Sequence, residues 1–396
     1  MDADPARATA PTVAVIGPLP PPLHGHMVFT RRLLGSRLLG SQFRLIHVDI
    51  SDHRGFETLG RFDPTNVLLA LRHYLRLVVV LARDRPDVVH VPLSQNMLGL
   101  GRDLGFVALV RIGRSSVVAQ VHGGGLDSLL ATSPRWFATP ARWLLRRCAA
   151  LVVMTRSRGE ALAAAVPGVR IVVVPHGTET TNVAPRTPDG SPLRALYVSS
   201  HLSEQKGLRP LVQSAVRAQE SGITAEWEIV GAWLSEDARA RAEARVRAVP
   251  GIHIRGALDR ERVAEAYSRA DVFVFPTGAS EGFALVRIEA MAAGLPVITT
   301  EAGGGGEIVR EGLEGFIVDY DAPEEIVARL RALRDDPGLL AEMSRRAQTR
   351  QRASFSEPKF ESGLAHLWHQ VTAVPTAPRT RGSVRRLRDD QSPYGS

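Results

Sequence analysis

The sequence predicts an α/β protein built from two doubly wound parallel-sheet units, and two observations support this fold class. Short β-branched runs alternate with helical patterns along nearly the whole chain, the order typical of parallel strands joined by crossover helices. Many of these runs are continuously apolar, as strands are when helices cover both faces of a sheet. The 396 residues are enough for two domains, each with its own core.

We expect six strands in each half of the chain. Those of the first half are residues 12–17, 43–49, 87–92, 116–122, 150–154 and 170–175. Those of the second half are residues 193–199, 225–231, 252–256, 271–275, 296–300 and 316–318. Helical periods fill the gaps, for example over residues 207–220 and 323–335.

A polar Pro/Gly segment, residues 181–192, separates the two halves and resembles an interdomain linker. The sequence therefore predicts an N-terminal domain over 12–180, a second domain over 190–355 and a last helix over 356–373. The tail 374–396 is rich in Pro, Gly, Ser and Arg and is expected to be disordered. We expect Trp143, Trp227 and Trp368 to be packing residues.

The composition, with 44% hydrophobic and 23% charged residues, is that of a globular protein. The most apolar run, residues 66–82, is interrupted by Arg72, His73 and Arg76, so we do not expect a membrane-spanning helix. The N-terminus lacks the apolar core of a secretory signal. The single cysteine, Cys148, is expected to be a buried thiol in a reducing compartment. These features predict a cytoplasmic protein.

The formal net charge is +8, with a surplus in the tail and on basic helical faces such as residues 30–44 and 141–148. Such faces suit a peripheral contact with an anionic membrane or an anionic substrate. Solvated surfaces of an arginine-rich protein explain them equally well. Nucleic acid is not an expected partner, because no zinc pattern or aromatic-basic signature accompanies the charge.

Polar residues and glycines follow five of the predicted strands, where open parallel sheets bind ligands. In chain order they are His24, Gly25 and His26; His122 with 123–125; His176 and Gly177; His201, Lys206 and Gly207; and 277–283. This pattern predicts a polar cleft between two facing sheets.

The residues of the second half together suggest a nucleoside diphosphate site. Lys206 supplies a cation at the entry to a helix, and the amides of Gly282 and Phe283 precede another helix start, where anions are favoured. Glu289 lies on the same apolar face as Ile288 and is placed to accept hydrogen bonds from a ribose diol. Glu281 would reach past the phosphates toward the group attached to them. No cluster of metal ligands is apparent, so we expect neither a metal nor another cofactor.

The block "EGFALVRIEAMAAGLPVI", with its two glutamates eight residues apart and "EQKG" upstream, resembles the GT-B glycosyltransferases of family 4 over about residues 12–372. The resemblance implies two Rossmann-like domains facing across a cleft, with a C-terminal helix, 358–372, that crosses back onto the first domain. It also implies a retaining transferase that uses a nucleoside diphosphate sugar and a glycan, lipid-linked or small-molecule acceptor.

The resemblance also implies roles for individual residues. Glu289 would bind the donor ribose, Glu281 the hydroxyls of the donor sugar, and Lys206 the diphosphate. The backbone from Gly282 through Phe283, Ala284 and Leu285 to residue 286 would complete the phosphate cradle. His122 would lie near the donor sugar and the reaction centre. The loop that contains His24, Gly25 and His26 would approach the phosphates and the acceptor.

Three positions depart from the family pattern. His201 stands where an arginine usually accompanies the lysine, so the charge that it contributes to diphosphate binding depends on pH. Pro175-His176-Gly177 replaces the usual "PNG", and Gly25 is the single glycine of a first loop that carries three prolines. Glu307 is expected to cap its own helix, although the resemblance places its loop near the donor.

From these features we predict a retaining glycosyltransferase of glycan, polysaccharide or glycolipid biosynthesis. Lys206 would stabilise the leaving diphosphate, with Glu281 and His122 positioning the sugar. Two alternatives remain: a sugar-nucleotide epimerase of similar fold, and a binding subunit that keeps the fold without catalysing transfer.

Overall fold

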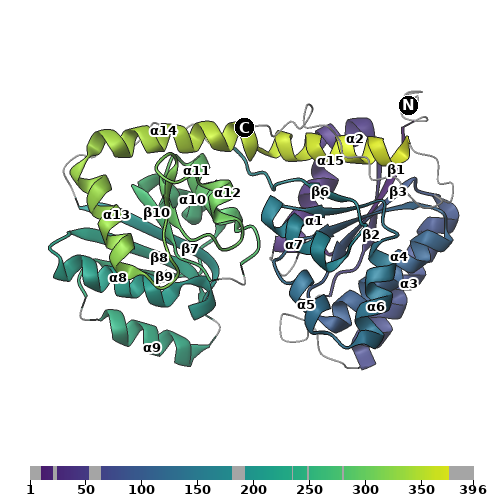
Figure 1. The fold of residues 1–396 in the computed structure, drawn as a ribbon, viewed down its shortest axis with the longest axis horizontal. Coiled ribbons are helices and arrows are strands. Elements are labelled where there is room, and N and C mark those ends of the chain that lie inside the picture. Colours follow the sequence, from purple (N-terminus) through teal and green to yellow (C-terminus); the bar gives the residue numbers. More distant parts are fainter. Residues whose placement is uncertain are drawn as a thin grey trace.

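The computed structural model describes residues 10–20, 25–52, 64–180, 192–233, 235–247, 249–278 and 281–373. Within these residues, twelve strands form two six-stranded parallel sheets, each flanked by helices (Figure 1). Each predicted strand overlaps one of the twelve, and the predicted α/β class with two doubly wound domains is confirmed. The predicted linker and the basic tail fall largely outside the described residues.

The first sheet has the strand order β2-β1-β3-β4-β5-β6. Its strands are β1 (Thr12–Gly17), β2 (Arg44–Asp49), β3 (Val88–Leu93), β4 (Ser116–Val121), β5 (Ala150–Val153) and β6 (Ile171–Val173). Its helices are α1 (Gly25–Gly35), α2 (Arg37–Gln42), α3 (Pro64–Arg83), α4 (Met97–Ile112), α5 (Leu126–Thr132), α6 (Arg135–Leu145) and α7 (Arg156–Ala165). The residues of β3 and β4 are all buried, as their continuously apolar sequences predict.

The second sheet has the order β12-β11-β10-β7-β8-β9. Its strands are β7 (Leu193–Leu202), β8 (Ala225–Trp233), β9 (Ile252–Gly256), β10 (Val272–Phe275), β11 (Val297–Thr299) and β12 (Gly315–Ile317). Its helices are α8 (Leu208–Glu220), α9 (Glu236–Val246), α10 (Arg260–Arg269), α11 (Leu285–Ala292), α12 (Gly305–Ile308), α13 (Pro323–Asp335) and α14 (Pro337–Ser354). A 3₁₀ turn, η3 (Glu204–Lys206), lies directly before α8.

The strand order reverses direction between β7 and β10, which are neighbours in the sheet. The chain proceeds outward from β7 through β8 and β9, and then returns to the other side of β7 with β10. Ligands of open parallel sheets bind beyond the carboxyl ends of the strands at such a point. The segments that follow β7 and β10 are therefore brought together although about 75 residues separate them.

The last helix, α15 (Glu357–Thr372), returns to the first domain, and Figure 1 shows α14 and α15 running along one side of both domains. Two backbone hydrogen bonds fix the point where the chain crosses between the domains. The amide of Thr178 donates to the carbonyl of Phe355 at 2.9 Å, and the amide of Glu357 donates to the carbonyl of Thr178 at 3.1 Å. Phe360, Leu364 and Trp368 of α15 join the core that includes β1 and α2. The predicted crossover helix is thus an integral part of the first domain.

Two of the three predicted packing tryptophans are buried, Trp227 and Trp368. The prediction is wrong for Trp143, which is 51% exposed and stacks under the guanidinium of Arg147, 3.3 Å from its ring centroid. Trp143 lies on the same side of α6 as the exposed Trp136, while Ala138, Ala141 and Leu145 make up its buried side. Cys148 is buried as expected, and burial raises the pKa of its thiol to about 12.

Candidate active site

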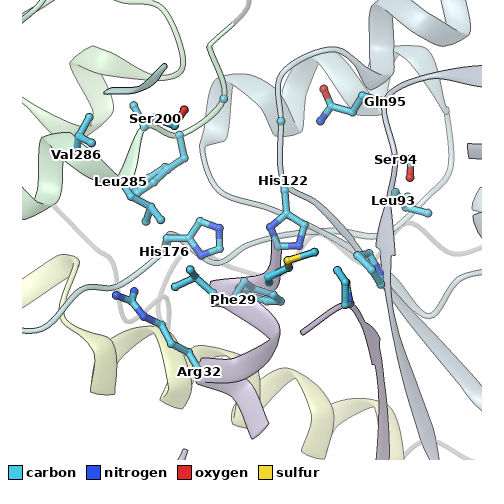
Figure 2. Close-up of a pocket in the computed structure, with 18 of the residues that line it drawn as sticks. Phe29, Arg32, Leu93, Ser94, Gln95, His122, His176, Ser200, Leu285 and Val286 are labelled. Carbon is cyan, nitrogen blue, oxygen red and sulfur yellow. The ribbon is translucent and has the colours of Figure 1, made fainter. Parts of the chain in front are cut away.

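A cavity of about 1200 Å³ lies between the two domains and is lined by residues of both (Figure 2). The first domain contributes α1 and the segments that follow β3, β4 and β6. The second domain contributes the last residues of β8, the segments that follow β7, β9 and β10, and the first turns of α11. All five strand ends that the sequence singled out are followed by a segment that borders this cavity.

Lys206 and Glu281 form an ion pair at the second-domain wall, with Nζ 2.7 Å from Oε2. The hydroxyl of Tyr197 donates to the carbonyl of Lys206 at 2.8 Å and fixes the turn that carries it. Gly207 follows with φ of +86°, and a Cβ there would collide with the carbonyl oxygen of Pro276. Only glycine fits this turn, which explains why a Lys-Gly pair ends it.

The Glu281 carboxylate is almost fully buried and is held in its ionised form. Burial by itself disfavours the charge, but the charge and hydrogen bond of Lys206, the charge of Arg287 and the amide of Gly282 outweigh it. The net effect lowers the pKa of Glu281 below its ordinary value. The hydroxyl of Thr277 also donates to Oε2, at 3.4 Å. The carboxylate is therefore a fixed acceptor beside the ammonium group.

Replacing Glu281 with glutamine should lower the free energy of unfolding at neutral pH by roughly 1–3 kcal/mol, because the ammonium of Lys206 loses its partner. A carboxyl with a lowered pKa stabilises the fold above its ordinary pKa of 4.5, and this contribution is lost as the pH falls through the lowered value. The difference between wild type and Glu281→Gln should therefore shrink below about pH 4.5 in denaturant unfolding. Glu220→Gln, at an exposed surface pair, is the control; a difference that does not change with pH would contradict the assignment.

The chain turns sharply into α11 at Ala284, whose φ is +49°. Leu285 and Val286 border the cavity (Figure 2), while the side chain of Phe283 is buried against His176, with ring centroids 5.8 Å apart. The first N–H groups of a helix lack intrahelical partners and favour anions. The Gly282 amide differs from the prediction, because it donates to Oε1 of Glu281 at 2.9 Å and is not directed to a ligand.

Glu289 borders the cavity one turn into α11. Burial raises the pKa of its carboxyl, while the charges of Arg32 and Arg260 and a hydrogen bond from Tyr267 oppose this shift. The Tyr267 hydroxyl lies 3.4 Å from Oε2. A carboxyl group of this kind, at the edge of a cavity and away from bulk water, suits the recognition of hydroxyl groups.

Arg287 is a buried charged residue behind the site that was not predicted. Its guanidinium is fully buried and donates to Thr299 Oγ1 at 3.0 Å and to the carbonyl of Ala302 at 2.7 Å. Burial lowers its pKa to about 10, so it stays charged at neutral pH and supports the ionised Glu281. Its position as a charged residue within the apolar run of α11 was the available signal.

His122 and His176 lie together on the first-domain side, with stacked rings whose centroids are 5.6 Å apart. Phe29 of α1 meets His122 edge to face at 4.5 Å and His176 at 5.3 Å. Figure 2 shows both imidazoles above Phe29, facing the cavity. The structure thus places His122 in the cleft and gives His176 an equivalent position.

The structure does not place every predicted residue at the cavity. His201 is absent from its lining, where Ser199 and Ser200 are found instead, and its Nδ1 lies 3.2 Å from Ser200 Oγ. Burial and the charge of Lys206 lower the pKa of His201, against the opposing charge of Glu281, so it is neutral at physiological pH. His24 lies outside the described residues; Gly25 and His26 begin α1, and Pro18 before them and Met27 after them border the cavity.

Two contacts join the domains beside the cleft, and neither was predicted. Glu307 does not cap its own helix but accepts from the amides of Arg156 at 2.6 Å and Ser157 at 2.8 Å, at the start of α7 in the first domain. Arg158 donates to the carbonyl of Gly124 at 2.7 Å and to that of Glu281 at 3.1 Å. These contacts hold the two walls of the cleft together.

Comparison with known proteins supports the same reading of both halves. A family model described as "Glycosyltransferase Family 4" matches residues 51–182, and one described as "Glycosyl transferases group 1" matches residues 192–336. A glycogen synthase of Mycobacterium tuberculosis is 27% identical over 311 residues, which are 75% of this chain and 72% of that protein.

Solved structures share the fold at low identity. The sucrose-phosphate synthase of Thermosynechococcus elongatus superposes with a TM-score of 0.72 and 18% identity, over 92% of this chain and 99% of that one. Anabaena HepE, solved with UDP and glucose, superposes with a TM-score of 0.63 and 16% identity, over 91% of this chain and 100% of that one. The two family models, the two facing parallel sheets and the returning C-terminal helix establish that this chain is a glycosyltransferase of family 4 (group 1) with the GT-B fold.

Proposed function

We propose that the protein is a retaining glycosyltransferase that moves a sugar from a nucleoside diphosphate to an acceptor hydroxyl, in the synthesis of a glycan, polysaccharide or glycolipid. The observation that carries this proposal is the Lys206–Glu281 pair beside the start of α11, on the wall of an interdomain cavity. The cavity of about 1200 Å³ is large enough for a nucleotide sugar together with part of an acceptor.

The donor fits the second-domain wall by its chemistry. Its diphosphate would lie between the Lys206 ammonium and the first amides of α11, and its ribose hydroxyls would donate to Glu289. Anabaena HepE, which shares the fold, was solved with UDP and glucose, and this supports a nucleotide-sugar donor.

In the reaction, the bond between the anomeric carbon and the diphosphate oxygen breaks, and the bonding electrons leave with the diphosphate. Lys206 and the amides of α11 stabilise the negative charge that builds up there. The acceptor hydroxyl attacks the oxocarbenium-like carbon from the same face, and its proton passes to a phosphate oxygen of the donor. Glu281 is held by Lys206, Thr277 and the Gly282 amide, so we assign it the positioning of the sugar and not nucleophilic attack.

Closure of the two walls would exclude water from this reaction. His122 and His176, stacked on the first-domain side, would contact the sugar or the acceptor. Of the contacts between the two walls, the one made by Arg158 of α7 reaches the carbonyl of Glu281 itself and that of Gly124, two residues after His122.

Thermal-shift measurements with UDP, GDP and ADP and their sugars test donor binding directly. A nucleotide at about 100 times its Kd should stabilise the protein by about 2.7 kcal/mol, seen as a higher melting temperature. Glu289→Ala should remove most of this shift, whereas Glu220→Ala should leave it unchanged. If no nucleotide raised the melting temperature of the wild type, the proposed donor site would be wrong.

We further propose that no divalent ion is needed, because the Lys206 ammonium and helix amides are placed to neutralise the diphosphate. Exhaustive EDTA treatment should leave nucleotide release at the untreated rate. An absolute requirement for added magnesium or manganese would overturn this. Nucleotide release that depends on an acceptor would also distinguish a transferase from an epimerase or a non-catalytic subunit.

A further inference from the structure

The outer face of α3 carries a stripe of exposed apolar side chains. Its members, spaced mostly three or four residues apart and each between 44% and 66% exposed, are Val67, Leu68, Leu71, Leu75, Val78 and Val79. Single exposed leucines are common on soluble proteins, but a stripe along a whole helix marks a binding surface. We call these six residues the α3 stripe.

The helix lies flat on the first domain, with the stripe directed outward. Of the helices in the described ranges, α3 is the one that is long and apolar enough to cross a bilayer. Its opposite face, however, is buried through His73 and Leu77, and Arg76 donates to the carbonyl of Asp49 at 2.7 Å and to its carboxylate at 3.1 Å. These contacts favour a helix that rests on a membrane surface over one that spans it.

A neighbouring helix on the same side of the domain, α6, also exposes large apolar side chains. The helices α3, α4 and α6 cover the same side of the first sheet and pack against one another in that order (Figure 1). On α6, Trp136 is 73% exposed and Trp143 lies seven residues later on the same side of the helix. Exposed tryptophans are enriched where proteins meet the headgroup region of a bilayer.

The charge of this layer is strongly positive. Residues 64–147 contain eleven arginines and four aspartates, with no lysine or glutamate, so most of the net surplus of +8 falls in this segment. Arg72 and Arg83 are exposed and follow the α3 stripe along one edge. An apolar stripe bordered by arginines is complementary to anionic lipid headgroups above an acyl layer.

The N-terminal turns of α3 also border the active-site cavity, through Asn66, Leu69, Ala70 and His73. If the α3 stripe rests on a membrane, the opening of the active-site cavity lies at the lipid surface. We propose that the α3 stripe and its flanking arginines dock the protein onto an anionic bilayer, from which a lipid-linked acceptor reaches the cleft. The part of this inference that concerns the acceptor rests on the proposed function.

Co-sedimentation of the full chain with phosphatidylcholine vesicles, with and without phosphatidylglycerol, tests the docking. The wild type should bind the anionic vesicles, and binding should weaken as salt is added. Arg72→Gln with Arg83→Gln should lower the partition coefficient about 25-fold, because each arginine near the surface contributes about fivefold. Leu71→Ser with Leu75→Ser should lower it at least as much, since both side chains would lose their burial in lipid.

Arg241→Gln with Arg247→Gln, two exposed positions of the second domain, makes the same change in charge and should leave vesicle binding unaltered. A wild type that stays in the supernatant with anionic vesicles would overturn the proposal. So would a concentration-dependent dimer that is abolished by the leucine substitutions while no vesicle binding is seen, since a second copy would then cover the stripe. The nucleotide-induced thermal shift is measured separately, so failure to dock leaves the proposed donor site standing, and failure to bind nucleotide leaves the docking standing.

Discussion

Replacing Lys206 with methionine should lower the turnover number by about 10²–10³-fold, the cost of removing a preorganised group that stabilises developing charge. Lys206 is one of only two lysines in the chain, the other 47 basic residues being arginine, so a lysine at this position is conspicuous. Its compact ammonium lies 2.7 Å from the Glu281 carboxylate and can be shared with a donor phosphate. Steady-state kinetics of nucleotide release measures the effect.

The second lysine supplies the matched control. Lys359→Met, on α15 at a position that does not itself line the cavity, should keep the wild-type rate. Methionine at 206 leaves Glu281 buried without its cation, so the double variant Lys206→Met/Glu281→Gln separates lost charge stabilisation from a disturbed carboxylate. The double variant should unfold at a higher temperature than Lys206→Met and still turn over slowly. Wild-type turnover by folded Lys206→Met would show that another group stabilises the leaving diphosphate.

The sequence was sufficient to predict which segments meet at the cleft. Strands of a parallel sheet place their carboxyl ends at one edge, so the residues after β7 and β10 had to become neighbours once these strands were adjacent. The predicted strand ends therefore already assign Lys206 and Glu281 to one site. The direct ion pair between them was not predicted, because it depends on the turn at Gly207 and on the rotamers of two long side chains.

Contacts between the domains could not be predicted. An acidic residue at a helix start, such as Glu307, satisfies the same preference whether the helix is its own or belongs to another domain. Its actual partners, the amides of Arg156 and Ser157, lie about 150 residues away across the cleft. Arg158 is likewise one arginine among many until its two carbonyl partners are known.

The orientation of α3 shows a different limit. Arg72, His73 and Arg76 gather on one side of the helix, so its hydrophobic period would place the opposite side, which carries the α3 stripe, against the sheet. The sequence correctly indicated that Arg72, His73 and Arg76 interrupt the apolar run, but the structure places the three side chains in different environments. His73 is buried, Arg76 holds Asp49, and Arg72 is exposed beside the stripe. Tertiary packing decides this, and it leaves the most apolar face in contact with solvent.

Replacing Trp368 with alanine should destabilise the first domain by about 3–5 kcal/mol, a large part of the 5–15 kcal/mol that typically separates folded from unfolded domains. Trp368 is fully buried, with its ring 5.3 Å from Phe43 and 5.8 Å from His90, both edge to face. The indole fills the space between α15 and the strands β3 and β4 that the helix covers. Alanine would leave a cavity there, because a fixed sheet cannot collapse into it.

The loss should appear first in the amide hydrogen exchange of β3 and β4, because two-domain proteins often unfold in more than one step and a single melting temperature would average them. Trp136→Ala is the matched control: the same side chain is removed from the same domain at a position that is 73% exposed, and stability should change by less than about 0.5 kcal/mol. Equal protection of β3 and β4 in the two variants would mean that α15 does not hold the first domain together. Loss of amide protection in β3 and β4 in Trp368→Ala alone would instead show that α15, which returns from the second domain, completes the core of the first. The first-domain wall of the cleft would then depend on this helix.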